Sequence, residues 1–432
     1  MQQQSNNNRT GDWLIIWKDG RAQTVHFSFN LISLISPDAI NCLTSLHQAC
    51  PGFTNMSRIL IKRSVTTRAS LLLLGSLMVV YLLKDIKVVR KDDNPDLKIR
   101  QPTKNNSYVY SWPRCQQNMS AAKITDFSSF PDFMKDFLYY RHCRHFPMLL
   151  DLPDKCGGAD KSAEVFLLLV IKSSPHNYDR RAILRKTWAE ERLQNGVWIR
   201  RVFLSGTTDS GFEKERLNKL LELEQREYSD ILQWDFTDTF QNLTLKQILF
   251  LEWMERNCPN VRFLLNGDDD VFANTDHMVE YLQSLKDNDG SKHLFTGHLN
   301  INMGLVREPN KYFVPVQIYE SNIFPPYCSG GGFLLSGYTA LVIYNMSQSI
   351  DLLPIDDAYM GMCLAKAGLD PTSHIAVKPF GLNIPSRLDG YDPCFYKEVL
   401  LVHGFFSVRM YFMWHRIHDP NLKCDVKKMI ST

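Results

Sequence analysis

One apolar run that ends in three consecutive acids constrains the fold of this chain more than any other feature of its sequence. The run covers residues 263–267, and Asp268, Asp269 and Asp270 follow it directly. An apolar run of this length predicts a buried strand, and open α/β sheets bind their ligands beyond the carboxyl ends of their strands. Three adjacent carboxylates repel one another, and Mg²⁺ or Mn²⁺ relieves this repulsion because both cations prefer oxygen ligands. The three acids alone fit a solvated turn somewhat better than a metal site, so the rest of the chain has to decide between the two.

The same strand belongs to a longer alternation of apolar segments and helical patterns. Residues 165–171 are continuously apolar, as is typical of a parallel strand that is covered on both faces. Helical patterns follow at 178–188, 212–228 and 243–257, with apolar segments between them. This alternation predicts an α/β fold with a doubly wound, mostly parallel sheet and helices on both faces.

A second apolar run, residues 69–83, predicts a membrane anchor. The run contains no charged side chain. It is shorter than the ~20 residues of a typical spanning helix, but Arg68 and Lys84 at its ends can snorkel towards the lipid headgroups. Because further cations precede the run, the N-terminus is expected in the cytoplasm. Met56 lies just before these cations, so we interpret residues 1–55 as an upstream extension. The resulting prediction is a type II membrane protein with a cytoplasmic tail over 1–68, a signal anchor over 69–83, a luminal stem over 84–138 and a luminal head over 139–432.

Cysteines and glycosylation sequons agree with a luminal head. Eight of the ten cysteines follow the predicted anchor, an even number that suits a disulfide-bonded domain and leaves the pairing open. Four Asn-x-Ser/Thr sequons also lie there, at Asn105, Asn118, Asn242 and Asn345. No Cys-x-x-Cys pair occurs among these cysteines, so a structural zinc site is not expected. The net charge of +3 and the lack of a basic stripe with aromatics predict no nucleic-acid partner.

Two polar features further along the chain fit acid–base and metal chemistry. Asp356 and Asp357 begin a helical pattern. One acid is enough to cap a helix, so the second is free to act as a base. His403 stands at the end of an apolar segment, where a lone histidine is more often a core residue than a ligand. It gains a metal-binding role only if the fold returns it to Asp270.

Two further motifs have both a functional and a purely structural interpretation. Three glycines at 330–332 allow the backbone to approach a ligand closely, although a flexible loop explains them equally well. The cations of the first helical pattern fit either a diphosphate site or a solvated helix face: Arg180, Arg181, Arg185 and Lys186.

Taken in order, these motifs resemble those of the β1,3-glycosyltransferase family of animal Golgi enzymes, in particular its β1,3-N-acetylglucosaminyltransferase branch. The matching segments, which extend over about 164–424, are Arg180-Arg181 to Thr187-Trp188, Asp235 to Lys246, Asp268 to Phe272, Tyr327 to Gly332, Ile355-Asp356-Asp357 and Val402-His403. Asn266-Gly267 and the helix entry after Pro354 look like those of the mucin core-extending members. Phe240 stands where the family commonly has Tyr, so this chain lacks that hydroxyl group.

The resemblance implies a glycosyltransferase-A fold that uses a UDP-sugar and Mn²⁺, or Mg²⁺ in its place. It implies that Asp268, Asp270 and His403 hold the metal and that Asp357 is the general base, with Asp356 as its neighbour and a helix cap. The residues implied around the nucleotide are Arg181, Arg185, Asp238, Lys246, Asp268 and Asp269. Gly331 and Gly332 are expected to form the floor of the sugar site.

The expected function is inverting transfer of N-acetylglucosamine from UDP-GlcNAc to the 3-hydroxyl of a terminal β-galactose. The expected acceptors are glycoprotein glycans, both O-glycan cores and poly-N-acetyllactosamine, or glycolipids, reached from the luminal side of the Golgi membrane. Two alternatives stay open: a β1,3-galactosyltransferase that uses UDP-Gal, and a non-catalytic luminal protein that binds glycans as a lectin does. A homo-oligomer is compatible with the sequence but is not required by it.

Overall fold

The computed structural model describes two separate parts of the chain. The described residues are 14–18, 21–25, 112–208, 211–329, 331–379, 392–405 and 407–424. They belong to two compact units, Met1–Asn105 and Asn106–Thr432. The first unit is described only where β1 (Leu14–Lys18) pairs with β2 (Arg21–Val25) in an antiparallel hairpin. The predicted anchor at 69–83 and the stem up to residue 111 lie outside the described residues. Within the described part, no helix has both the length and the apolar character needed to span a bilayer.

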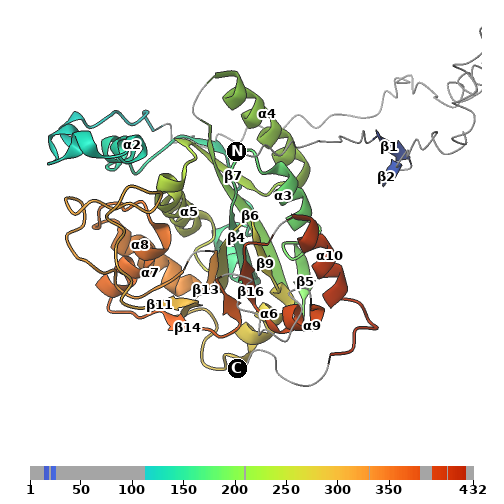
Figure 1. Cartoon of the computed structure of the whole chain (residues 1–432). Helices are drawn as coiled ribbons and strands as arrows, with labels where there is room; N and C mark the ends of the chain where they lie inside the picture. The colour runs from blue at the N-terminus through green and yellow to red at the C-terminus, as the bar shows by residue number, and fades with distance from the viewer. Residues whose placement is uncertain are drawn as a thin grey trace, which may run out of the picture. The chain divides into compact units, whose positions relative to one another are not determined.

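A nine-stranded sheet forms the centre of the second unit (Figure 1). Its four central strands run parallel in the order β8 (Phe263–Asp268), β4 (Val165–Lys172), β6 (Val197–Thr207) and β7 (Ile231–Thr237). The predicted α/β class and its parallel core are therefore confirmed. Strand β8 ends on the first of the three acids, so the carboxylates emerge at the carboxyl edge of the parallel strands.

The outer strands make the sheet mixed rather than purely parallel. On one side, β13 (Gly332–Ser336) pairs antiparallel with β8, β10 (Phe295–Gly297) pairs antiparallel with β13, and β14 (Thr372–Ser373) completes the edge. On the other side, β3 (Met148–Leu150) and β5 (Arg192–Gln194) pair antiparallel with β7 and β6. Strand β13 begins beside the end of β8, with Gly332 opposite Gly267. The glycine motif and the triple aspartate are neighbours for this reason.

Helices cover both faces of the sheet, as predicted (Figure 1). One core lies under α2 (Asp132–Tyr140), α5 (Leu243–Asn257), α7 (Gly337–Ser347) and α8 (Asp356–Lys366). The other core lies under α3 (Tyr178–Leu184), α4 (Gly211–Tyr228), α6 (Thr275–Ser284), α9 (Pro393–Glu398) and α10 (Ser407–Ile417). In β4, Leu168 and Val170 face the first core, whereas Leu167 and Leu169 face the second. Alternate side chains point to opposite faces, and both faces are buried, which explains why this strand is continuously apolar.

Two small sheets accompany the central one, and one of them connects the acids to a distant part of the chain. Strand β9 (Val271–Ala273) follows the acids directly and pairs antiparallel with β16 (Leu401–His403), which in turn pairs parallel with β15 (Val377–Lys378). Strand β11 (Leu299–Asn300) pairs antiparallel with β12 (Tyr327–Cys328). Because His403 lies opposite Val271, the ladder returns this histidine to the acids.

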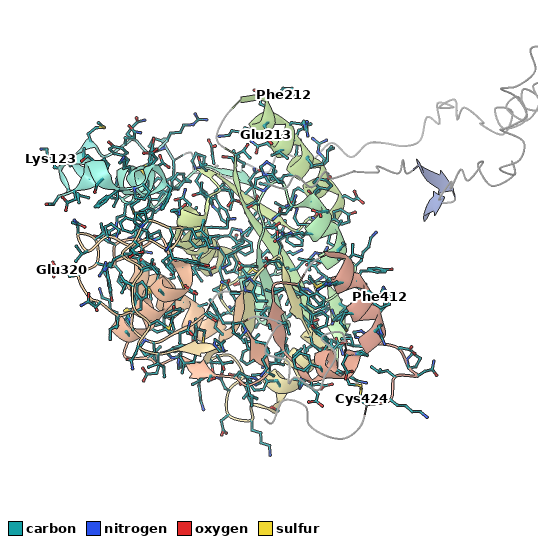
Figure 2. All side chains as sticks on the ribbon, in the orientation of Figure 1. Lys123, Phe212, Glu213, Glu320, Phe412 and Cys424 are labelled. Carbon is teal, nitrogen blue, oxygen red and sulfur yellow. A yellow bond between two sulfur atoms is a disulfide. The ribbon has the colours of Figure 1, made fainter. Side chains whose placement is uncertain are left out.

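Three disulfides fasten the head, which begins before the boundary expected at 138/139. They join Cys115 to Cys143, Cys156 to Cys258 and Cys394 to Cys424, the last near the end of the described chain (Figure 2). Cys328 and Cys363 are buried free thiols. The short helices η2 (Met119–Lys123), η3 (Phe127–Ser129), η4 (Ala159–Glu164) and η5 (Phe240–Asn242) complete the described elements. Helix α2 spans the expected stem boundary and packs on the core of the head.

Candidate active site

A cavity of about 620 Å³ opens at the carboxyl edge of the parallel strands. The residues around it come from segments far apart in the sequence, including the ends of β4 and β8, the start of α8 and the end of β16. Most of the predicted site residues line this cavity: Asp238, Lys246, Asp268, Asp269, Asp270, Gly331, Asp357 and His403. The position at the strand ends is the one that open α/β sheets use for ligands.

Three of these residues form a group that fits a divalent cation. One ligand atom each from Asp268, Asp270 and His403 lies within 4.8 Å of the other two. The Oδ1 atom of Asp270 is buried, and its contact with Nε2 of His403, at 3.4 Å, is longer than a normal hydrogen bond, so this oxygen can bind a cation. Two carboxylates and one imidazole suit Mn²⁺ well, because oxygen ligands suit manganese and imidazole binds most divalent transition metals. The fold therefore brings together the three residues for which a metal role was expected.

His403 is held so that its second ring nitrogen faces Asp270. The Nδ1 atom lies 3.1 Å from the carbonyl oxygen of Pro379, which can only accept, so Nδ1 carries the proton. The Nε2 atom lies 3.4 Å from Oδ1 of Asp270, and this carboxylate raises the pKa of His403 above its ordinary value. Burial raises the pKa of Asp270, but His403 and the Arg180 guanidinium lower it by more, so the net shift is downward. The Pro379 contact orients the imidazole as backbone carbonyls commonly do for metal-binding histidines.

Gly331 makes room for this histidine. Its φ of +96° lies in the left-handed region, and a Cβ atom on it would stand 2.7 Å from Cγ of His403. Gly332 differs from the prediction because it is buried in β13 and does not line the cavity. A Cβ there would stand 2.5 Å from Leu401 Cδ1, so this glycine allows β16 to approach β13. Gly330 lies outside the described residues.

Asp269 points towards α3, although it also borders the cavity. Its carboxylate accepts hydrogen bonds from Asn177 Nδ2 at 2.8 Å and from Arg180 Nη1 at 2.7 Å. Burial raises the pKa of Asp269, and the hydrogen bonds and the Arg180 charge only partly oppose this. The middle acid of the three therefore fastens the start of α3 beside the cavity.

Arg181 and Arg185 lie away from the cavity, which differs from the expectation that both surround the nucleotide. Arg181 is 1% exposed and donates to Glu224, Ser173 and two backbone carbonyls. Arg185 donates to Glu224 on α4 and to Asp230 directly before β7, and neither acid lines the cavity. The physical reason is that neighbouring helix positions point about 100° apart, so the guanidinium groups of a single helix cannot all face one ligand.

The acids of α8 also differ in part from the expectation. Asp357 lines the cavity from the first turn of α8, as its role as base requires. Asp356 was expected to cap this helix, but the N-cap is Ile355, which has no side-chain cap. The carboxylate of Asp356 instead accepts a hydrogen bond from Lys172 at 2.6 Å.

The sequence patterns did not single out Lys172. They also did not show that Lys246 and Asp238, both predicted near the nucleotide, pair with each other. Lys172 is the last residue of β4 and lies opposite Asp268 in the parallel ladder. A charged residue directly after the continuously apolar run 165–171 was a usable signal for it. Lys246 pairs with Asp238 at 2.7 Å in the cavity wall, and Asp238 also accepts from the Gly206 amide at 2.9 Å.

An aromatic corner forms another wall of the cavity. The Phe240 and Tyr312 rings meet edge to face with their centroids 5.4 Å apart. The Lys311 ammonium lies over both rings, 5.3 Å from the Phe240 centroid and 4.7 Å from that of Tyr312. Aromatic faces and edges of this kind offer an amphipathic ligand, such as a sugar, an apolar surface.

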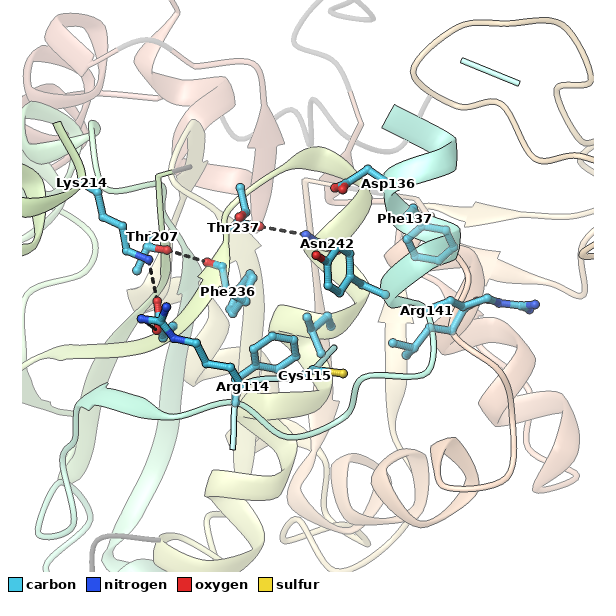
Figure 3. A pocket seen from close by; sticks show the side chains of 15 residues that line it. Arg114, Cys115, Asp136, Phe137, Arg141, Thr207, Lys214, Phe236, Thr237 and Asn242 are labelled. Carbon is cyan, nitrogen blue, oxygen red and sulfur yellow. Dashed lines mark hydrogen bonds and ion pairs between the residues drawn. The ribbon is translucent and has the colours of Figure 1, made fainter. Parts of the chain in front are cut away.

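A second cavity, of about 360 Å³, lacks the chemistry of the first (Figure 3). It lies between the segment around Cys115 and strand β7, and none of the predicted site residues lines it. Asp235 accepts from Lys214 at 2.7 Å and lies 3.2 Å from the Arg114 guanidinium, so its charge is already balanced. The cavity at the strand ends is therefore the candidate active site.

Comparison with known proteins places the chain in one family. Residues 179–374 match the family model described as Galactosyltransferase. The chain is 47% identical over 342 residues to human N-acetyllactosaminide β-1,3-N-acetylglucosaminyltransferase 3, covering 76% of this chain and 90% of that protein. It is 48% identical over 323 residues to human acetylgalactosaminyl-O-glycosyl-glycoprotein β-1,3-N-acetylglucosaminyltransferase, covering 74% and 83%. It is 41% identical over 318 residues to mouse UDP-GlcNAc:βGal β-1,3-N-acetylglucosaminyltransferase 7, covering 72% and 78%. The chain therefore belongs to the galactosyltransferase family, in its branch of β1,3-N-acetylglucosaminyltransferases.

Proposed function

We propose that this protein transfers N-acetylglucosamine from UDP-GlcNAc to the 3-hydroxyl of a terminal β-galactose, with inversion at the anomeric carbon. The observation that carries the proposal is that one cavity contains both a metal-type ligand group, Asp268, Asp270 and His403, and a separate carboxylate, Asp357. A binding protein needs no base, whereas the proposed inverting, metal-assisted transfer uses both groups. We further propose a glycosyltransferase-A fold and a single-pass type II anchor in the Golgi membrane that places the head in the lumen.

The relatives support the choice of donor and acceptor. The names of all three relatives specify transfer of N-acetylglucosamine through a β1,3 linkage. The mouse relative is named for UDP-GlcNAc and β-galactose, and one human relative for O-linked glycoproteins. We therefore propose galactose-terminated glycans of glycoproteins or glycolipids as acceptors.

The proposed reaction assigns different tasks to the two sides of the cavity. Asp268, Asp270 and His403 would hold Mn²⁺, which when bound neutralises the charge that develops on the departing UDP. Asp357 removes the proton from the 3-hydroxyl of the acceptor while that oxygen forms its bond to the anomeric carbon. The bond from the anomeric carbon to the UDP oxygen breaks on the opposite side, so the α-linked donor gives a β product. The aromatic corner of Phe240 and Tyr312 offers a face for stacking the acceptor sugar.

Transfer assays on the purified full-length chain test the proposal. UDP-GlcNAc and UDP-Gal are each offered with galactose-terminated and GlcNAc-terminated acceptors, with Mn²⁺ and with EDTA. We expect Mn²⁺-dependent transfer of GlcNAc to galactose only. A preference for UDP-Gal would favour the galactosyltransferase, and UDP-sugar binding without any transfer would favour the lectin-like protein.

Asp357→Asn separates the two sides of the mechanism. We expect transfer to fall by about 10²- to 10⁴-fold, the range for loss of a general base. UDP binding in the presence of Mn²⁺ should persist, because the metal-type group is intact. Normal turnover of a folded Asp357→Asn protein would contradict the base assignment.

A further inference from the structure

One buried ammonium group joins the two sides of the candidate active site. The Nζ atom of Lys172 lies 3.1 Å from Oδ1 of Asp268, at the end of β8, and 2.6 Å from Oδ2 of Asp356, in the first turn of α8. The Lys172 side chain is only 6% exposed. A single cation therefore contacts one carboxylate of the metal-type group and the residue next to the proposed base.

The electrostatic environment keeps this lysine charged. Burial lowers the pKa of Lys172, but the charges of Asp268 and Asp356 and their hydrogen bonds raise it by more, so the net shift is upward. A buried ammonium is unfavourable unless it is paired and hydrogen-bonded, and here it is paired on two sides. Without it, Asp268 and Asp356, which both contact this ammonium group, would be neighbouring like charges.

The two contacts of Lys172 have different structural origins. Its neighbour Asp268 is set by the parallel ladder, in which the two residues are register partners. Its contact with Asp356 joins residues 184 positions apart in the sequence, and α8 is not part of the sheet. The contact from Lys172 to Asp356 therefore fastens the first turn of α8, which carries Asp357, to the end of the sheet, which carries the acids.

We propose that Lys172 is a positioning residue, which fixes the distance and orientation of Asp357 relative to the metal-type group through its contacts with Asp356 and Asp268. The inference rests on the proposed function, because it assigns Asp357 the role of base. A displacement of ~1 Å at a reacting group costs about 10²-fold in rate, so a small movement of this turn is sufficient. Binding of UDP and Mn²⁺ should depend on Lys172 much less than turnover does.

Metal affinity and turnover should respond in different directions when the charge is removed. Lys172→Met keeps a side chain of similar length but removes the cation beside Asp268. A more negative site attracts a divalent cation at least as strongly, so Mn²⁺ affinity should be unchanged or higher. The same change frees the first turn of α8, so kcat should fall by about 10²-fold. A lysine that directly contacted the diphosphate would instead weaken UDP binding.

The experiment compares five variants of the full-length protein: Lys172→Met, Lys172→Arg, Asp356→Asn, the double variant Lys172→Met/Asp356→Asn, and Lys155→Met. Lys155 is the matched control, because its side chain is also 6% exposed and its Nζ lies 2.6 Å from Glu191, away from the cavity. Mn²⁺ and UDP affinities come from isothermal titration calorimetry, kcat and KM from transfer assays, and stability from thermal unfolding. We expect Lys155→Met to lower the unfolding temperature but to leave kcat unchanged. We expect Lys172→Arg to retain more activity than Lys172→Met, because it keeps the charge.

Several outcomes would overturn the proposal. One is a normal kcat for Lys172→Met, and another is a loss of Mn²⁺ or UDP affinity that accounts for the whole loss of activity. A normal kcat for Asp356→Asn beside an impaired Lys172→Met would also overturn it, because the effect would then not pass through α8. If Lys172→Met does not fold, Asp356→Asn carries the test, because it weakens the same contact from the side of α8.

The double variant also separates this inference from the proposed function. Positioning through one shared contact predicts that its kcat is no lower than that of Lys172→Met alone. It also predicts that the two stability losses are not additive, and this coupling is measurable even if the wild-type protein transfers no sugar. Absence of transfer in the wild type would refute the proposed function, whereas additive stability losses would refute the contact itself.

Discussion

Gly331→Ala tests whether the glycine motif exists to bring His403 to the acids. The substitution has two separable consequences, because Gly331 has a φ of +96° and its Cβ would stand 2.7 Å from Cγ of His403. The left-handed backbone costs an alanine about 1–2 kcal/mol. The contact is far shorter than a normal van der Waals distance, so the imidazole or the backbone must move. A movement of His403 away from Asp270 should weaken the metal-type group.

Gly368→Ala is the matched control. Gly368 has a φ of +68°, and a Cβ on it would meet nothing within 4 Å. It follows α8 at the end remote from Asp357. This control therefore has the backbone strain of Gly331→Ala without the contact with the histidine.

Thermal unfolding and Mn²⁺ titration of activity measure the two effects. We expect Gly368→Ala to lower the free energy of unfolding by about 1–2 kcal/mol, and Gly331→Ala to lower it by at least as much, because its Cβ also overlaps His403. Only Gly331→Ala should raise the Mn²⁺ concentration needed for half-maximal activity, by about 10- to 100-fold, the range for residues that hold metal ligands in place. A Gly331→Ala protein with the Mn²⁺ requirement of the control would refute the reasoning, since His403 would then not depend on the glycine.

Three further predictions concern residues outside the metal-type group. Arg181→Met should lower the free energy of unfolding by about 3–5 kcal/mol, as loss of one partner of a buried ion pair does. The same variant should keep the KM for UDP-GlcNAc unchanged. A raised KM with normal stability would instead place Arg181 at the nucleotide. The Asp276 carboxylate, 2.8 Å from His418, raises the pKa of that histidine, so His418 stabilises the fold below about pH 6.5 and loses this effect as the pH rises through its folded pKa. The difference in unfolding temperature between wild type and His418→Gln should therefore shrink from pH 5.5 to pH 8.5. A difference that stays constant with pH would contradict this prediction. If the head is luminal, peptide mass spectrometry should find a glycan on Asn118, whose side chain is exposed, but not on Asn242. The side-chain amide nitrogen of Asn242, where a glycan would be attached, already donates a hydrogen bond to the Thr237 carbonyl at 2.8 Å. A glycan on Asn242 and none on Asn118 would contradict this prediction.

The fold class could be predicted because its signals are local. An uninterrupted apolar strand such as 165–171 needs cover on both faces, and the structure supplies a core on each side of β4. The antiparallel strand β13 could not be predicted, because its pairing with β8 joins segments that only the complete sheet brings together. The same is true of α2, which packs on the core although most of its residues precede the expected boundary.

Two predictions about the cations failed for one physical reason. The sequence shows which residues carry charge, but it does not show which opposite charges lie nearby. Glu224 on α4 and Asp230 before β7 take the donors of Arg181 and Arg185. Arg180, one position away on the same helix, instead pairs with Asp269 at 2.7 Å and lies 3.8 Å from Asp270. A change of about 100° between neighbouring helix positions therefore decides which arginine reaches the acids.

The amino-acid sequence by itself determined the α/β class, the position of the acids at the end of a buried strand, and the resemblance to the β1,3-glycosyltransferases. These properties depend on periodicity and on motifs that lie within a few residues of one another. Only the tertiary structure decided that His403 meets Asp270 across the β9–β16 ladder and that Lys172 contacts both Asp268 and Asp356. Such contacts join residues 96 to 184 positions apart, and their geometry depends on strand register and helix packing, which no local pattern encodes.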